Sequence, residues 1–328
     1  MSYIISKPEA SGFAAALADF VIDSDKTVSF EVQYKGNSIL SEEYVPDSSN
    51  QIVVRKIGKF CNNALWGSWP SGNSTAQTNQ FGTFTFLVDG QTHSSLVVFS
   101  RTAPARSLAD TPVLSSAQVK VTRPDVPEWA SGLFNSGETV TVKYSDSYGE
   151  IHSATLYTHS GSQGVVTLDC SYSRVKSLLG GGLMLAYQVV RQNGGLMTFC
   201  VDHSVYPQKF VFRAKNNFDV PESVVCVGPV KLKGGDNSET GYMFGIERKF
   251  IIRPDDEFTA SSGYLFMQSE YRIWRDFLNA QEAQIQIDGT WYDIVITKQN
   301  YTRTLQNNRL DSVEFSFRFA DPDNNGIL

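Results

Sequence analysis

Charge is scarce in this chain, and basic residues are not in excess. Charged residues make up 19% of the 328 residues, and the formal net charge is -6. Such a low charge content argues against a long disordered segment, and the lack of a basic excess argues against nucleic acid as the primary partner. With 41% hydrophobic and 12% aromatic residues, the composition is that of a globular protein. The length predicts two or three domains of roughly 100 residues each.

Cysteine and histidine are also few, and neither shows the spacing of a metal site. The four cysteines lie far apart in the sequence: Cys61, Cys170, Cys200 and Cys226. The four histidines include no pair one helical turn apart: His93, His152, His159 and His203. We therefore expect buried thiols rather than a zinc site or a disulfide scaffold. We also expect no metal ion and no cofactor.

Catalytic templates are missing as well. There is no Gly-x-Ser-x-Gly elbow, and the glycines at 180–182 are followed by no Lys-Ser or Lys-Thr, so they predict a turn rather than a phosphate loop. Residues 321–326 resemble the start of a calcium loop but lack its distal glutamate. Residues 42–43 and 255–257 are runs of adjacent acidic residues. Neighbouring residues of a strand point to opposite faces, so these carboxylates are not expected to form the facing pair that glycoside hydrolysis needs. We expect no catalytic residue and no enzyme activity.

No segment resembles a membrane span or a secretory signal. Residues 1–8 have neither the basic start nor the long apolar core of a signal peptide. Residues 12–22 are apolar but interrupted by Asp19, and they fall short of the roughly 20 residues that a spanning helix needs. We expect synthesis and folding in the cytoplasm, without membrane insertion.

What the chain has in abundance is the alternating pattern of antiparallel strands. Runs of alternating apolar and polar residues flank short turns rich in glycine, asparagine and aspartate, which predict hairpins. These turns fall at residues 35–37, 89–90, 147–149, 192–195 and 288–289. Further strands are expected at residues 210–213, 223–231 and 242–253, and a polar turn at residues 306–309. In residues 312–319, Val313 and the three phenylalanines face one side and polar residues the other, so one face is predicted to be buried and the other wet.

One helix is expected in the whole chain, at about residues 265–280. Its apolar residues recur every three or four positions and form one stripe: Met267, Tyr271, Trp274, Phe277 and Leu278. Proline-rich residues 102–127 and residues 203–207 suggest domain boundaries. The predicted fold is mainly β. It has two β-sandwich-like domains, at 1–104 and 105–204, followed by an antiparallel β-sandwich or barrel domain with one docked helix, at 205–328.

The best candidate for a binding site is the loop between the strands of the first domain. Residues 61–82 are rich in glycine, serine, asparagine and threonine, and they carry Trp66 and Trp69. Two indoles in a polar loop are costly to expose without a partner, so they are candidates for contact with a protein or a glycan. The alternative is that both indoles fold back and cap the sandwich core.

The C-terminal third resembles tail and baseplate components of tailed bacteriophages and prophages, including distal-tail-like proteins. The matching segments contain the sequences FVFR at 210–213, NFDVPESV at 217–224, WRDFL at 274–278 and LDSVEFSFRFA at 310–320. The resemblance covers roughly 120 residues and is one of fold more than of chemistry. It implies a structural protein of the virion that forms a symmetric ring and contacts other tail or baseplate subunits, or the host surface.

These observations favour an assembly component that acts through protein–protein contacts and forms a homo-oligomeric ring. The main alternative is an adhesin or carbohydrate-binding protein at the bacterial cell surface, with a host glycan or protein as its partner. A third is a glycoside hydrolase whose site the sequence does not reveal.

Overall fold

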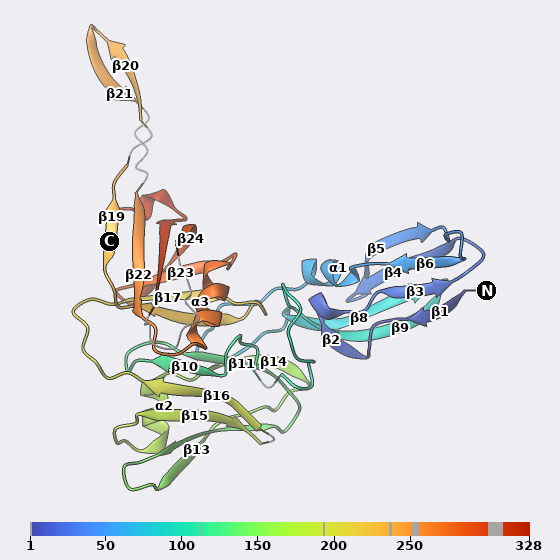
Figure 1. Ribbon diagram of the computed structural model, residues 1–328, viewed down its shortest axis with the longest axis horizontal. Coiled ribbons are helices and arrows are strands. Elements are labelled where there is room, and N and C mark those ends of the chain that lie inside the picture. Colours follow the sequence, from blue (N-terminus) through green and yellow to red (C-terminus); the bar gives the residue numbers. More distant parts are fainter. Residues whose placement is uncertain (1, 112, 193, 236–237, 251–255, 301–310) are drawn as a thin grey trace.

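The protein is mainly β, as predicted, with its strands arranged in several sheets. The computed structural model describes residues 2–111, 113–192, 194–235, 238–250, 256–300 and 311–328. In Figure 1 a first sandwich extends to one side, a second lies beneath a large curled sheet, and a hairpin projects from that sheet.

The first sandwich consists of a five-stranded sheet, β2-β9-β8-β4-β5, and a three-stranded sheet, β1-β3-β6. Its elements are β1 (Tyr3–Ser6), β2 (Ser11–Phe13), η1 (Ala14–Ala16), β3 (Phe20–Asp23), β4 (Val28–Tyr34), β5 (Asn37–Tyr44), β6 (Gln51–Val54), α1 (Ile57–Asn63), β8 (Phe81–Val88) and β9 (Gln91–Val98). The Phe20 ring of the small sheet lies 5.2 Å from the Phe30 ring and 5.4 Å from the Phe86 ring of the large sheet. The two sheets therefore enclose one aromatic core.

The second sandwich consists of a five-stranded sheet, β10-β16-β15-β12-β13, and a three-stranded sheet, β11-β14-β7. Its elements are β10 (Val119–Thr122), β11 (Trp129–Phe134), β12 (Thr139–Ser145), β13 (Ile151–Thr158), β14 (Gly164–Asp169), α2 (Tyr172–Leu179), β15 (Ala186–Arg191) and β16 (Gly194–Val201). The remaining strand, β7 (Ser74–Ala76), comes from the loop at 61–82 and pairs with β14. This pairing crosses the boundary predicted near residue 104.

The third part is a seven-stranded sheet, β18-β17-β23-β24-β25-β22-β19, in which all neighbouring strands are antiparallel. Its elements are β17 (Phe210–Lys215), β18 (Pro221–Cys226), β19 (Val230–Lys233), β22 (Glu257–Tyr264), α3 (Glu270–Leu278), β23 (Ala283–Ile287), β24 (Thr290–Asn300), β25 (Ser312–Phe319) and η2 (Pro322–Asn324). Between β19 and β22 the chain forms a separate hairpin of β20 (Glu239–Met243) and β21 (Ile246–Phe250).

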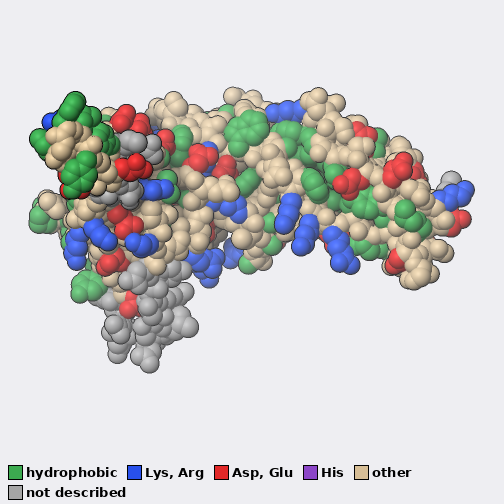
Figure 2. All heavy atoms as spheres, turned by 90° about the horizontal axis from the view of Figure 1, so that it is seen from above, with side chains coloured by type: hydrophobic (Ala, Val, Ile, Leu, Met, Phe, Trp, Pro, Cys, Tyr) green, Lys and Arg blue, Asp and Glu red, His purple; other side chains and the backbone are tan. Residues whose placement is uncertain are grey.

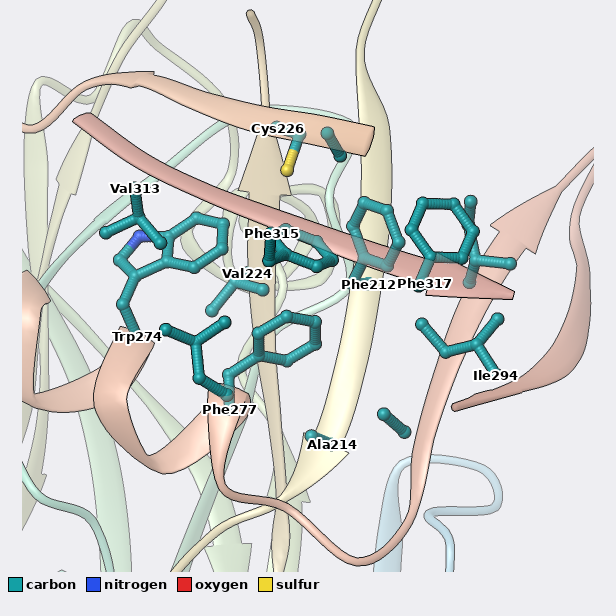
Figure 3. Packing of buried hydrophobic residues seen from close by; sticks show 14 of the residues in the cluster. Phe212, Ala214, Val224, Cys226, Trp274, Phe277, Ile294, Val313, Phe315 and Phe317 are labelled. Atoms are coloured by element: carbon teal, nitrogen blue, oxygen red, sulfur yellow. The ribbon is translucent and has the colours of Figure 1, made fainter. Parts of the chain in front are cut away.

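Helix α3 packs its apolar stripe on the phenylalanines of this sheet (Figure 3). The Phe277 ring lies 5.8 Å from that of Phe212 on β17 and 5.2 Å from that of Phe315 on β25. Trp274 and Phe277 are buried as the helical periodicity predicted, whereas Met267 and Tyr271 are only partly buried. The docked helix and the antiparallel sheet of the C-terminal domain are thus confirmed.

The predicted hairpins are present, and several of their turn residues have the left-handed backbone that tight turns need. Lys35 and Gly36 have φ values of 50° and 79°, and Asp288 and Gly289 have values of 48° and 82°. Strand pairing confirms the hairpins β4–β5, β8–β9, β12–β13, β15–β16 and β23–β24. The predicted polar turn at 306–309 lies outside the described residues, as does residue 193.

Four expectations were wrong. Residues 223–231, expected as one strand, contain the end of β18 and the start of β19, which lie at opposite edges of the seven-stranded sheet. The chain contains the short helices α1 and α2 in addition to α3. The described part of the strand expected at 242–253 belongs to a hairpin that turns at Phe244 and Gly245, while residues 251–253 lie outside the described residues. Ser316, expected on the wet face of β25, is 8% exposed and pairs with Thr259 of the neighbouring strand β22, whose hydroxyl lies 3.1 Å from its own.

Candidate functional site

The two indoles proposed as binding residues occupy different environments. Trp66 is 52% exposed, and its backbone N–H donates to the carbonyl of Asn79. Trp69 is half-buried and stacks on the guanidinium of Arg213, whose central carbon lies 4.5 Å from the ring centroid. Trp66 thus presents an aromatic surface to solvent, whereas Trp69 contacts the C-terminal domain of its own chain.

The loop that carries them is held by contacts to both other domains. The Gly67 N–H donates to Asp219 Oδ2 at 2.6 Å, in the turn between β17 and β18. A Cβ at Gly67 would lie 1.6 Å from the Asp219 carbonyl oxygen, so only glycine fits this approach. The Gln77 side chain donates to Ser68 O and to Thr167 Oγ1 of β14. Together with the β7–β14 pairing, these bonds make the loop a connection between the three domains.

Arg213 lies at the centre of a cluster of three indoles from three parts of the chain. Its guanidinium carbon is 4.5 Å from the ring centroid of Trp69, 4.1 Å from that of Trp291 and 5.7 Å from that of Trp129. We call these four residues the Arg213 cluster. All three indoles are half-buried, and Arg213 is 7% exposed. At such distances the π-electrons of the rings attract the cation.

Strand register explains how the cluster forms. Phe212 and Ala214 of β17 point into the core of the C-terminal domain, so Arg213 points to the opposite face. Arg213 pairs with Gln284 on β23, and the next Gln on that face, Gln286, pairs with Trp291 on β24. The Arg213 Nε–H donates to Gln284 Oε1 at 2.7 Å. The sequence predicted strands here and did not reveal the indoles that meet on this face.

Burial affects the charge of Arg213. It lowers the pKa of the guanidinium from its ordinary value of 12.5 to about 10, and the charge of Asp293 partly opposes this effect. Asp293 also accepts a hydrogen bond from Gln284 Nε2 at 2.7 Å. The guanidinium remains charged at neutral pH, with indole faces rather than a carboxylate around it.

A second polar cluster, of buried charges, joins the second and third domains. Lys120 Nζ on β10 donates to Glu128 Oε2 at 2.5 Å and to the Ser223 carbonyl of β18 at 2.6 Å. Lys120 is 4% exposed and Glu128 0% exposed. Beside them, Glu222 accepts hydrogen bonds from the Ser115 hydroxyl at 2.6 Å and the Asn216 amide at 3.3 Å.

Burial raises the pKa of the Glu222 carboxyl from its ordinary value of 4.5 to about 7. The positive charge of Lys120 and the hydrogen bond from Ser115 oppose the rise, and the negative charge of Asp276 adds to it. Since the folded-state pKa is the higher one, the folded chain binds more protons than the unfolded chain between pH 4.5 and 7. The stability due to this proton is therefore fully present below pH 4.5 and is lost as pH rises through 7.

Replacing Glu222 by glutamine should remove this pH dependence. Relative to the E222Q variant, the wild-type chain should lose about 3 kcal/mol of unfolding free energy between pH 4.5 and pH 8. Urea denaturation at several pH values would measure the difference. The exposed Glu150→Gln variant is the control, and a wild-type–E222Q difference that does not change with pH would contradict the expectation.

The β20–β21 hairpin, which we call the arm, projects away from the body of the molecule (Figure 1) and exposes apolar side chains. Its exposed apolar residues are Tyr242 (78%), Met243 (39%), Phe244 (93%), Ile246 (59%) and Phe250 (37%). Seen from above in Figure 2, hydrophobic side chains gather on the arm. Met243 pairs with Ile246, and the Phe250 ring lies over Gly241, where a Cβ would be 2.8 Å from it. Met243, Ile246 and Phe250 therefore lie on one face of the ribbon, together with the charged Glu239 and Arg248.

The tip of the arm is strained. Phe244 has φ = 55°, a left-handed conformation that bulky residues rarely adopt. Such a conformation costs about 1–2 kcal/mol for a residue with a Cβ. The residue in this conformation, Phe244, carries the most exposed aromatic ring of the arm.

Most of the acidic and histidine side chains considered in the sequence analysis can be located among the described residues. Across the described residues, one group of potential metal ligands lies within 4.8 Å of one another: Asp146, Glu150 and His152. It occupies the exposed β12–β13 turn, where His152 lies 2.9 Å from Asp146 Oδ2. Residue 255 of the acidic pair at 255–257 lies outside the described residues, and Glu257 pairs with Lys298 at 2.9 Å. Asp321 Oδ1 accepts a hydrogen bond from the Asp323 N–H in the short helix η2.

The cysteines are free thiols. Cys61, Cys170 and Cys226 are buried, as expected, and Cys200 is partly buried. Burial raises the pKa of Cys61 to about 12, and those of Cys170 and Cys226 well above their ordinary values. These buried thiols are protonated at neutral pH and therefore poor nucleophiles.

Comparison with known proteins yields weak structural similarities. Neither a protein-family model nor a curated protein matches the sequence. A chain of the virion of a native gene transfer agent particle is 11% identical, with a TM-score of 0.26, and the match covers 36% of this chain and 95% of that one. The I9–I11 tandem of titin is also 11% identical, with a TM-score of 0.17 and coverage of 79% and 94%. At these TM-scores the similarities identify neither fold nor function. In the described part of the chain, no helix has the length and apolar character required to span a bilayer.

Proposed function

We propose that this chain is a structural subunit of a bacteriophage or prophage tail or baseplate that assembles through protein–protein contacts. The observation that carries the proposal is the arm, a projecting two-stranded ribbon with five exposed apolar side chains, among them the phenylalanine at its tip. The resemblance of residues 210–320 to tail components supplies the context of the virion.

An isolated two-stranded ribbon is marginally stable in water, because it has no second layer to bury its side chains. The arm has exposed apolar residues on both sides of its turn, and Phe244 is held in a strained conformation. Exposed aromatic residues of this kind are typical of protein interfaces, where a few of them dominate the binding energy. We therefore expect the arm to be buried against another subunit in the assembled state.

The neighbouring edge of the sheet carries charges that oppose nonspecific strand pairing. Strand β19 is the last strand of the seven-stranded sheet and carries exposed Lys231 and Lys233. Charged side chains on an edge strand disfavour strand addition by other chains. The arm is then the surface through which specific contact occurs, with copies of this chain in a ring and with other tail subunits as the partners.

Phe244→Asn tests the proposal without disturbing the arm itself. Asparagine tolerates the left-handed conformation, so the hairpin turn should form at least as readily, while the aromatic contact is lost. We expect the wild-type chain to form oligomers as concentration rises and F244N to weaken this association roughly 30-fold, the effect of removing a residue worth about 2 kcal/mol. Sedimentation velocity over a concentration series would measure it.

Tyr148→Asn is the matched control. Tyr148 is 91% exposed in the turn of the β12–β13 hairpin, so this variant also removes one exposed aromatic residue from a hairpin turn. It should associate as the wild type does. A wild-type chain that stays monomeric up to its solubility limit, or an F244N variant that associates normally, would refute assembly through the arm.

A further inference from the structure

Arg213 has hydrogen-bond donors that its own chain does not use. Arg213 is 7% exposed, and its Nε–H donates to Gln284 Oε1. Across the described residues, no oxygen accepts a hydrogen bond from Nη1 or Nη2, and no carboxylate forms an ion pair with the guanidinium. Both Nη atoms retain contact with solvent, since neither is a fully buried atom without a partner.

The geometry of the cluster explains which directions remain open. The rings of Trp69 and Trp291 lie 4.5 Å and 4.1 Å from the guanidinium carbon and cover it through their π-faces. The N–H groups of a guanidinium lie in its plane, and their fork matches the two oxygens of a carboxylate. The indoles therefore line the guanidinium carbon, and the outer N–H groups, which donate to no oxygen of the described residues, can bind such a group.

Lys215, two residues along the same face, does not have this freedom. Its Nζ lies 5.5 Å from the Trp69 ring centroid and 2.7 Å from Glu282 Oε2. The positive charge of Lys215 is therefore paired within the chain, whereas that of Arg213 is surrounded by indoles and an amide. The net charge of -6 also means that an acidic ligand would be held by this local site and not by the overall charge.

We propose that the Arg213 cluster is a docking site for a carboxylate side chain, aspartate or glutamate, of a partner protein. The carboxylate binds bidentately to Nη1 and Nη2 of Arg213, and the half-buried indoles of Trp69, Trp129 and Trp291 surround it. Tryptophan and arginine are the residues most enriched at the energetic centres of protein interfaces, and here four of them converge. That the partner is a tail or baseplate subunit rests on the proposed function, but the carboxylate site does not.

The test uses the full-length chain and short blocked peptides, so it is separate from self-association through the arm. Acetyl-tetraglutamate-amide is titrated into the protein by calorimetry, with acetyl-tetraglutamine-amide as the neutral probe. We expect saturable binding of the glutamate peptide alone. Arg213→Gln should weaken it at least tenfold, because a charge-assisted pair is lost. Arg213→Lys should give an intermediate loss, because a point charge replaces the planar fork.

Arg318→Gln is the control, since it removes the same charge from an exposed position on β25 of the same domain. It should bind as the wild type does, and near-UV circular dichroism should show that R213K keeps its tertiary packing. Equal losses in R213Q and R318Q, or R213K binding as well as the wild type, would overturn the proposal.

Binding of glucuronate without binding of the glutamate peptide would reassign the site to acidic sugars. Repeating the titration with F244N distinguishes the two proposals, because this variant should lose association and keep peptide binding.

Discussion

Replacing Phe212 by alanine is expected to lower the free energy of unfolding by about 3–5 kcal/mol. Phe212 is 0% exposed at the centre of the C-terminal core (Figure 3). Its ring makes edge-to-face contacts with Phe277 at 5.8 Å, and with Phe315 and Phe317 at 5.4 Å. Truncation leaves a cavity that the three neighbouring rings, one on α3 and two on β25, fill only partly, so transfer and cavity costs add.

Urea denaturation followed by tryptophan fluorescence would measure this loss, because Trp274 lies in the same core. Phe266→Ala is the control, since Phe266 is 62% exposed and its removal should change stability by roughly 0.5 kcal/mol or less. A Phe212→Ala variant within 1 kcal/mol of the wild type would show that this core is not packed as described.

Lys120→Met is expected to destabilise the chain by about 3–5 kcal/mol for a different reason. Methionine fills a similar volume, but the carboxylate of Glu128, which is 0% exposed, loses the ammonium that lies 2.5 Å from it. Glu128 keeps only the hydroxyl of Ser223, which donates to Oε2 at 2.6 Å, while its Oε1 has no partner. An unpaired buried charge costs several kcal/mol, more than the net contribution of the pair itself.

The double variant Lys120→Met/Glu128→Leu separates charge from packing. Removing both charges together should restore most of the lost stability, because apolar residues of similar volume often replace a buried ion pair without loss. Thermal and urea denaturation of the two variants would measure the recovery. A double variant less stable than K120M would show that the hydrogen bonds of the cluster, rather than the unpaired charge, cause the effect.

Short-range patterns predicted the antiparallel framework well, because hairpin turns are decided by a few adjacent residues. The Asp89-Gly90 and Asp288-Gly289 pairs adopt the left-handed turns that their composition favours. The stripe containing Trp274 and Phe277 likewise predicted the buried face of α3. These features depend on residues within one turn or one helix, so tertiary structure adds little to them.

The errors occurred where local signals were weak. Helix α2 buries Tyr172 and Val175 but few other side chains, so it has only a partial apolar stripe, although Gly180 with φ = 81° ends it in a typical way. The arm was interpreted as one strand because Phe244, a residue unusual in a left-handed turn, occupies the position where asparagine or aspartate would have signalled a hairpin. Strand β7 was missed because its three residues pair with a strand about 90 positions away.

The candidate site shows the same division. Trp69 could be singled out from the sequence because two indoles in a polar loop are unusual. Its neighbours Trp129, Arg213 and Trp291 lie at distances of 60 to 222 positions from it, and no local pattern connects them. They meet because β17, β23 and β24 align Arg213 with Trp291 while the loop and β11 bring Trp69 and Trp129 against the same face.

By itself, the sequence determined the β-rich class, the positions of most hairpins and the helix that covers the C-terminal sheet, since these follow from turn geometry and side-chain periodicity. Only the tertiary structure decided that the tryptophan loop joins three domains, that Arg213 is surrounded by indoles, and that the apolar side chains of the arm project from the body. The reason is that contacts between distant segments depend on the packing of whole sheets, which the order of residues within any one strand does not specify.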